Sequence, residues 1–209
     1  MVMETELKFT VHDRAVFDGV RAMKRIGGYD LVDRGAAVHT DTYFDTGDLC
    51  MFNGKVILRM RACVDGTVLT FKAQARSYDG IYRRVEINEP VDITPEAIGS
   101  GACDDLPPMT ALREQVGDIA LAPSLTVRNN RHTIHCVREG LPQFEIVLDD
   151  VTFSGPRGEA HALELEVESL GGSDDDLSII GRELSERFNL APAGPSKYIL
   201  GMKLLGNAE

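Results

Sequence analysis

The sequence predicts an α+β fold in which an eight-stranded antiparallel β-barrel carries helices packed on its outside. The first observation is an alternation of charge, since Glu4, Glu6 and Lys8 alternate with Thr5 and Leu7. Side chains two residues apart in a strand lie on the same face. Later segments repeat this alternation, so many strands are expected to place charge on one face and apolar residues on the other. Turn signals between the strands favour hairpins, and amphipathic helices can cover an apolar exterior.

Length and composition limit the class of protein. A chain of 209 residues is expected to form a single domain over residues 1–209. The net charge of −11 argues against general binding to nucleic acid or to an anionic membrane. No apolar run approaches the length of a membrane span and no secretion signal is expected, so a cytoplasmic location is predicted. The four cysteines form no CxxC pair and are expected to be free thiols.

The first fifty residues are expected to contain two strands and a helix. Val2–Thr10 is the first strand, and Asp13 is a suitable N-cap for the helix that follows. Gly27-Gly28 is expected to end this helix. His39–Phe44 is the second strand, and Asp45–Asn53 is expected to form a turn or a short helix. One face of the predicted helix carries Val16, Val20, Met23 and Ile26.

The next segment is expected to form antiparallel hairpins. Val56–Val64 and Thr67–Ala75 are strands, and Asp65-Gly66 between them is a strong two-residue hairpin signal. Asp79-Gly80 is expected to turn the chain into a fifth strand, Tyr82–Glu89.

The central segment is expected to be helical before strands resume. Thr94–Gly101 and Pro108–Gly117 carry helical signals, with Thr94-Pro95 at an N-terminus. Leu125–Arg138 is expected to be a strand that is interrupted at Asn129-Asn130.

The last third of the chain returns to strands and then ends in helices. Gln143–Phe153 and Ala160–Ser169 are the last two expected strands. Asp174–Phe188 is an amphipathic helix, and Ser196–Leu205 is expected to be the final helix. The apolar side of the longer helix carries Leu177, Ile180, Leu184 and Phe188.

The charged faces suggest a strongly charged ligand inside the barrel. Burying cations alone or carboxylates alone would cost too much free energy, and a core of ion pairs alone is less stable than an apolar one. Guanidinium groups match phosphate oxygens, and carboxylates bind divalent cations that bridge to phosphates. A polyphosphate–metal complex would complete the pairing. The cationic set is Lys8, Arg59, Arg61, Lys72, Arg84, Arg131 and Lys197, and the acidic set is Glu4, Glu6, Glu86, Glu145, Asp149, Glu164, Glu166 and Glu168.

Each of these rows taken alone has a plainer explanation. Glu4, Glu6 and Lys8 alone could form a solvated strand face. Glu164, Glu166 and Glu168 alone could form an exposed edge of the sheet. Tyr43 and Phe44 are expected to serve packing rather than chemistry. The histidines have no shared ligand spacing, so they are interpreted as ordinary polar residues. The functional interpretation depends on the conjunction of six alternating strands.

Several segments together resemble the CYTH, or triphosphate tunnel metalloenzyme, superfamily. Glu4-Thr5-Glu6-Leu7-Lys8 resembles its ExExK signature, and Arg131 falls where the family has a basic residue on its sixth strand. Each motif is weak alone, but they follow the family order over almost the whole chain. The other similar segments are Thr42–Thr46 (YFDT), Leu58–Arg61 (LRxR), Thr70–Lys72 (TxK), Arg84–Glu86 (RxE), Leu148–Val151 (LDxV), Glu164–Glu166 (ExE) and Ser196–Tyr198 (SKY).

The resemblance implies a tunnel that binds triphosphates with Mg²⁺ or Mn²⁺. It implies catalytic roles for Lys8, Glu4 and Glu6, and a phosphate-binding role for the whole cationic set given above. The implied metal ligands are Glu4, Glu6, Glu164, Glu166, Asp149 and Glu168.

The implied activity is hydrolysis of a small triphosphate, with inorganic triphosphate as the first candidate. The layout is most similar to the bacterial inorganic triphosphatase branch. A class IV-type adenylyl cyclase, a thiamine or nucleoside triphosphatase, and a non-catalytic polyphosphate-binding module stay open as alternatives. No nucleic-acid or membrane partner is expected, and a homodimer is left open.

Overall fold

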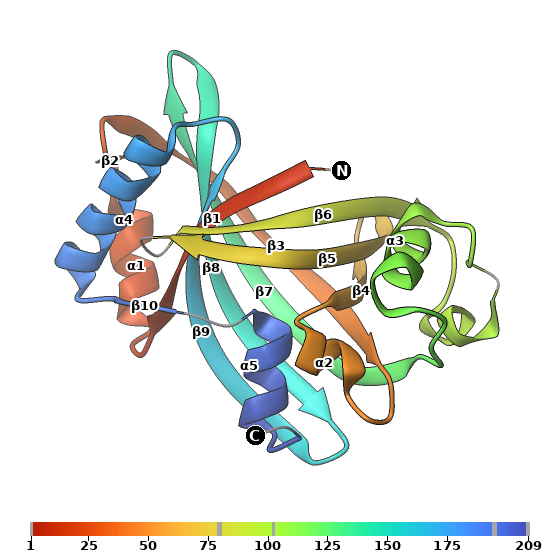
Figure 1. Cartoon of the computed structure of the whole chain (residues 1–209). Helices are drawn as coiled ribbons and strands as arrows, with labels where there is room; N and C mark the ends of the chain where they lie inside the picture. The colour runs from red at the N-terminus through yellow and green to blue at the C-terminus, as the bar shows by residue number, and fades with distance from the viewer. Residues whose placement is uncertain (1, 79–80, 102, 194–195, 208–209) are drawn as a thin grey trace.

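The computed structural model describes residues 2–78, 81–101, 103–193 and 196–207 (Figure 1). The expected turn at Asp79-Gly80 lies outside the described residues. The fold is a β-barrel with helices on its outside and at one end, so the prediction of the fold class is confirmed.

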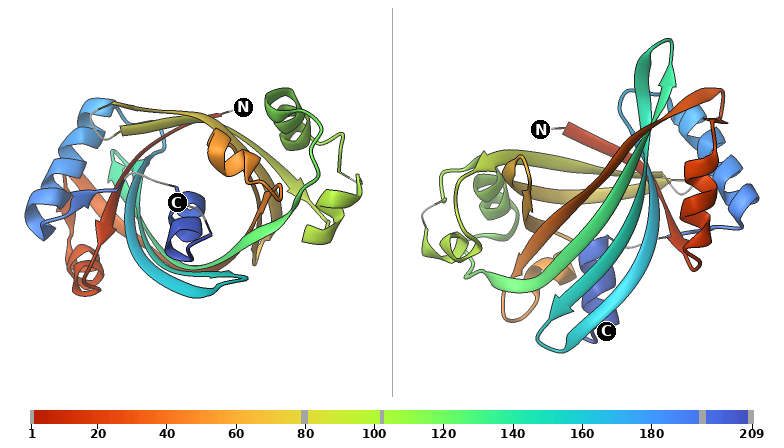
Figure 2. Two further views of the ribbon diagram at one scale, coloured as in Figure 1. Left: turned by 60° about the horizontal axis from the view of Figure 1, so that its bottom comes forward. Right: turned by 180° about the vertical axis from the view of Figure 1, so that it is seen from behind.

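In the part of the chain that the structure describes, eight long strands close into an antiparallel barrel. They follow the order β1-β6-β5-β4-β3-β7-β8-β9, and β9 pairs back onto β1 (Figure 2, left). Two short strands, β2 (Arg25–Ile26) and β10 (Ala191–Pro192), extend the sheet beside β3 and β1. The long strands are β1 (Val2–Val11), β3 (Tyr29–Asp45), β4 (Ile57–Cys63), β5 (Gly66–Tyr78), β6 (Ile81–Val91), β7 (Ala122–Arg138), β8 (Leu141–Gly155) and β9 (Gly158–Ser169).

The helices cover the apolar outer face of the barrel on two sides. α1 (Ala15–Ala22) and α4 (Asp174–Phe188) pack against β1, β8 and β9, where Leu177 and Ile180 join a core with Leu7 and Leu165. The 3₁₀ helix η1 (Pro95–Ser100) and α3 (Pro107–Val116) cover β4 and β5 on the opposite side (Figure 2). The charge alternation places apolar side chains on the outer face of the barrel, and these helices bury them.

Two further helices lie at one end of the barrel. α2 (Cys50–Gly54) follows β3, and α5 (Lys197–Leu204) lies across the same end (Figures 1 and 2). Tyr43, Phe153, Tyr198 and Met202 form the apolar cluster that holds α5 against the strands. None of the helices in the described residues is both long enough and apolar enough to span a membrane.

The structure corrects the predicted boundary between the first helix and the second strand. α1 ends at Ala22, and Gly27 and Gly28, with φ of 54° and 82°, form the turn between β2 and β3 instead of a helix end. β3 begins at Tyr29, ten residues before the predicted start at His39. Most side chains between residues 30 and 38 are exposed on both faces, so the alternation that marks a half-buried strand is missing there.

The predicted interruption at Asn129-Asn130 is also wrong. β7 runs without a break from Ala122 to Arg138, and Asn129 points into the barrel, where it is fully buried opposite His39. An asparagine pair is a common turn signal, but here the ladder hydrogen bonds to β3 and β8 keep both residues extended. The segment expected as a helix over Thr94–Gly101 is the 3₁₀ helix η1.

Candidate functional site

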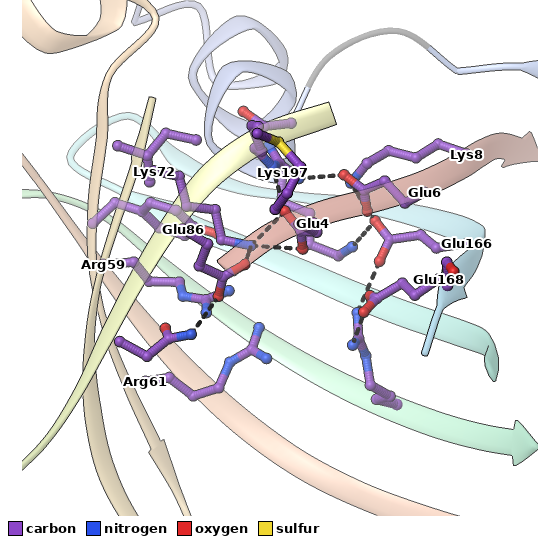
Figure 3. Close-up of a pocket in the computed structure, with 18 residues that line it drawn as sticks. Glu4, Glu6, Lys8, Arg59, Arg61, Lys72, Glu86, Glu166, Glu168 and Lys197 are labelled. Carbon is purple, nitrogen blue, oxygen red and sulfur yellow. Dashed lines mark hydrogen bonds and ion pairs between the residues drawn. The ribbon is translucent and has the colours of Figure 1, made fainter. Parts of the chain in front are cut away.

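The charged faces of the strands line a cavity of about 280 Å³ inside the barrel. Among the described residues, seven cationic side chains and five carboxylates line it (Figure 3). The cations are Lys8, Arg59, Arg61, Lys72, Arg84, Arg131 and Lys197, and the carboxylates are Glu4, Glu6, Glu86, Glu166 and Glu168.

The lining is divided into a cationic side and an acidic side. Arg59, Arg61 and Lys72 come from β4 and β5, whereas Glu6, Glu166 and Glu168 come from β1 and β9 across the cavity (Figure 3). The register explains this division, because Glu6 pairs with Glu168 and Lys8 with Glu166 in the β1–β9 ladder. An anionic ligand and a cation can therefore be bound at neighbouring places in the same cavity.

Two fully buried aspartates hold guanidinium groups at the cavity wall. Asp41 accepts two hydrogen bonds from Arg61, at 2.7 and 2.8 Å, and Asp149 accepts two from Arg131, at 2.8 and 2.7 Å. Such bidentate pairs fix the plane of the guanidinium group. Asp41 was missed by the sequence analysis, although it alternates with His39 and Tyr43 on a predicted strand.

The buried Asp41 makes the stability of the barrel sensitive to acid. Burial opposes ionisation, but Arg59 and Arg61 outweigh it and lower the pKa of Asp41 from 3.8 to about 2. A carboxylate with a depressed pKa contributes stability above its unfolded-state pKa, and this contribution is lost as the pH falls through the folded-state value. We expect Asp41→Asn to lower the free energy of unfolding by about 2 kcal/mol at pH 7.

The difference between Asp41→Asn and the wild type should narrow between about pH 4 and pH 2, where the wild-type carboxylate becomes protonated. Urea unfolding of both proteins across this pH range measures the difference. A difference that stays constant down to pH 2 would contradict the assigned ion pair.

Glu4 lies between the cationic and acidic sides. Its carboxylate is 2.8 Å from Lys72 Nζ and also contacts Arg84, which reaches Glu6 as well. Burial alone would raise the pKa of Glu4, but Lys72 and Arg84 hold this pKa below its usual range. Burial and the neighbouring Arg84 lower the pKa of Lys72 despite Glu4. The cations here are crowded, so an anionic ligand would relieve repulsion between them.

A first group of carboxylates, formed by Glu4, Glu6 and Glu168, is suited to a divalent cation. Oxygen atoms of all three lie within 4.8 Å of one another. Burial and the nearby carboxylates of Glu166, Glu6 and Glu4 raise the pKa of Glu168 to about 7, although Arg131 opposes this shift. Within this group, Glu168 is thus the carboxylate that its neighbours neutralise least, and the three side chains together offer the oxygen ligands that a hard divalent ion prefers.

A second group of carboxylates, formed by Asp149, Glu164 and Glu166, already surrounds an ammonium group. Lys197 Nζ is 2.8 Å from an oxygen of each of the three. All four side chains are buried. Burial alone would lower the pKa of Lys197, but the three carboxylates hold this pKa well above its usual value. A lysine side chain therefore occupies the position that a second cation would otherwise take.

The sequence matches a known domain family over almost its whole length. Residues 3–197 match the CYTH domain family. The chain belongs to the CYTH family. No curated protein sequence matches it.

Solved structures share the fold of this CYTH domain at low sequence identity. An adenylyl cyclase candidate from Hippeastrum, described as having a dominant triphosphatase activity, has a TM-score of 0.72 at 15% identity, covering 96% of this chain and 95% of that one. An adenylate cyclase candidate from Bacillus halodurans has a TM-score of 0.67 at 18% identity, covering 96% and 98%. A protein from Pyrococcus horikoshii has a TM-score of 0.55 at 17% identity, covering 96% and 98%.

The CYTH barrel brings all the predicted site residues around one interior. Asp149 and Glu164 lie behind the cavity lining, where they contact Lys197. Glu145, from the wider acidic set, is not part of the lining and lies 3.8 Å from His135. Tyr43, predicted to serve packing, lines the cavity while its ring stacks on Tyr198. Thr70, which belongs to the TxK segment and for which no role was predicted, accepts a hydrogen bond from Arg59 at 3.3 Å.

Proposed function

We propose that this CYTH domain hydrolyses a triphosphate with the help of Mg²⁺ or Mn²⁺, and that inorganic triphosphate is its preferred substrate. The observation that carries the proposal is the division of one cavity into a cationic side and a group of three carboxylates whose oxygen atoms lie within 4.8 Å of one another. A triphosphate with one divalent cation still carries net negative charge, which the cationic side chains of the lining can bind.

The cationic side chains would bind the phosphates and stabilise the charge that develops during transfer. Arg61 and Arg131 are held in fixed planes by Asp41 and Asp149, so their orientation costs little on binding. Arg59, Lys72 and Arg84 would complete the phosphate site, as would Lys8.

Glu4, Glu6 and Glu168 would hold the divalent cation. When bound, such an ion supplies charge neutralisation and lowers the pKa of a coordinated water. Lys8 lies 3.3 Å from Glu6 and 2.5 Å from Glu166. Burial opposes its charge, but Glu166 and Glu6 raise the pKa of Lys8 above its usual value. Lys8 therefore stays protonated and would orient the water or stabilise the leaving group rather than act as a base.

Adenylyl cyclase activity is the second candidate, since two of the similar structures are named as cyclase candidates. A cyclase must also hold a purine and present the ribose hydroxyl. Among the described residues that line the cavity, Tyr43 is the only aromatic one, and its ring is already stacked on Tyr198. The cavity of about 280 Å³ is also at the lower limit for an organic ligand. Both observations favour inorganic triphosphate over ATP.

A phosphate-release panel tests the proposal. Inorganic triphosphate, ATP, thiamine triphosphate and pyrophosphate are compared with Mg²⁺ and with Mn²⁺, and the ATP reactions are also assayed for cyclic AMP. We expect the highest kcat/KM with inorganic triphosphate and no turnover in EDTA. Cyclic AMP as the main product, or triphosphate binding without turnover with either metal, would overturn it.

A further inference from the structure

Two residues of the family-like segments, Asp45 and Tyr198, have no role in the proposed chemistry, yet both are almost fully buried. Tyr198 directly follows Lys197 in the first turn of α5. Its hydroxyl donates a hydrogen bond of 2.6 Å to Asp45 at the end of β3. The exposed fraction of each residue is 1%.

The Asp45 carboxylate joins three elements at the end of the barrel. It accepts backbone N–H hydrogen bonds from Thr46 at 2.7 Å and from Met51 and Phe52 at 2.9 Å each. With Tyr198, this gives α2, α5 and the end of β3 a common acceptor. In the part of the chain that the structure describes, no cation lies within ion-pair distance of Asp45. Its charge is therefore balanced by oriented donors, and each lost donor leaves the buried carboxylate less well solvated.

The ring of Tyr198 is fixed as firmly as its hydroxyl. It stacks on Tyr43 with 5.2 Å between ring centroids and an interplanar angle of 12°, and Phe52 meets it edge-on at 6.1 Å. Neighbouring side chains of a helix differ by about 100° in direction. Fixing Tyr198 toward Asp45 thus fixes the rotation of α5 that directs Lys197 into the barrel.

We propose that the Asp45–Tyr198 hydrogen bond is a positioning device for Lys197, and that Asp45 and Tyr198 are positioning residues for the site. Lys197 Nζ must lie within 2.8 Å of three carboxylates at once, so a small rotation of α5 breaks at least one of these contacts. The loosened ammonium would then no longer balance Asp149 and Glu166, which hold Arg131 and Lys8 at the cavity.

Tyr198→Phe tests this inference because it removes the hydroxyl and keeps the ring. Tyr29→Phe is a matched control, since Tyr29 is also 1% exposed and donates to an aspartate, Asp176, at 2.8 Å. Each variant loses one hydrogen bond to an aspartate, and Tyr198→Phe should lose more thermal stability because Asp45 is more deeply buried than Asp176. Only Tyr198→Phe should lower kcat/KM for inorganic triphosphate, by about tenfold. In a Lys197→Met background, Tyr198→Phe should have no further effect on kcat/KM.

A second measurement is independent of turnover. The protons of a buried, hydrogen-bonded ammonium exchange slowly with water, so Lys197 should give a resolved ¹H–¹⁵N signal that is absent in Lys197→Arg. We expect Tyr198→Phe, but not Tyr29→Phe, to shift or broaden this signal. An unchanged signal in Tyr198→Phe, or a kinetic loss that adds in full to that of Lys197→Met, overturns the inference. The kinetic measurement rests on the proposed function. If the wild type hydrolyses no triphosphate, the proposed function is wrong, and the ¹H–¹⁵N signal of Lys197 alone tests whether Tyr198 positions Lys197.

Discussion

Replacing both Glu4 and Glu6 by glutamine is expected to lower metal-dependent triphosphate hydrolysis by about 1,000-fold, equivalent to about 4 kcal/mol of transition-state stabilisation. Glutamine keeps the size of each side chain and removes two of the three charges that would hold the cation. The phosphate-binding side chains are unchanged, and Arg84 loses two competing anions. Inorganic triphosphate should therefore still bind in EDTA, while Mn²⁺ binding, measured by electron paramagnetic resonance, should be lost.

The matched control removes two carboxylates away from the cavity. Glu139 and Glu159 are both exposed, and their double replacement by glutamine makes the same change in net charge. This control should keep wild-type turnover and Mn²⁺ binding. Circular dichroism of both double variants checks that the barrel is retained. Full activity in Glu4→Gln/Glu6→Gln would rule out the metal assignment.

The sequence predicted those parts of the fold whose strands have one buried and one charged face. The alternation around Arg59, Lys72 and Glu166 follows the pleat of a strand, so face and chemistry could be inferred together. Residues 30–38 of β3 have no such signal, because neither face is covered and no apolar period is required there. Asn129 was misinterpreted because local turn preference was outweighed by ladder pairing on both sides.

Pairing across the barrel could not be predicted from strand patterns. The sequence predicts that Asp149, Glu164 and Lys197 are charged interior residues. It predicts the two carboxylates as metal ligands and the lysine as a phosphate-binding residue, not as partners of one another. Asp149 and Glu164 are cross-strand neighbours in the β8–β9 hairpin, and only the position of α5 brings Lys197 to them. Asp41 was missed for the same reason, since its importance comes from Arg61 on the neighbouring strand.

Removing the ammonium of Lys197 is expected to have the largest effect on stability. Lys197→Met leaves Asp149, Glu164 and Glu166 buried together with less positive charge than they need. Breaking a buried ion pair from one side costs about 3–5 kcal/mol, and we expect a loss of this size in the free energy of unfolding. Lys203→Met is the matched control, because Lys203 lies on the same helix and is exposed. Urea denaturation in EDTA measures both variants.

The same variant tests how many cations the site needs. With Lys197 in place, the second carboxylate group is already neutralised, so the wild type should bind one Mn²⁺ per chain, at Glu4, Glu6 and Glu168. In Lys197→Met the emptied group has the charge and oxygen ligands for a second ion, and Mn²⁺ binding stabilises whichever state holds it. Mn²⁺ should therefore raise the melting temperature of Lys197→Met more than that of Lys203→Met, with two ions bound per chain. Two ions in the wild type would instead mean that Lys197 leaves its carboxylates when metal is present.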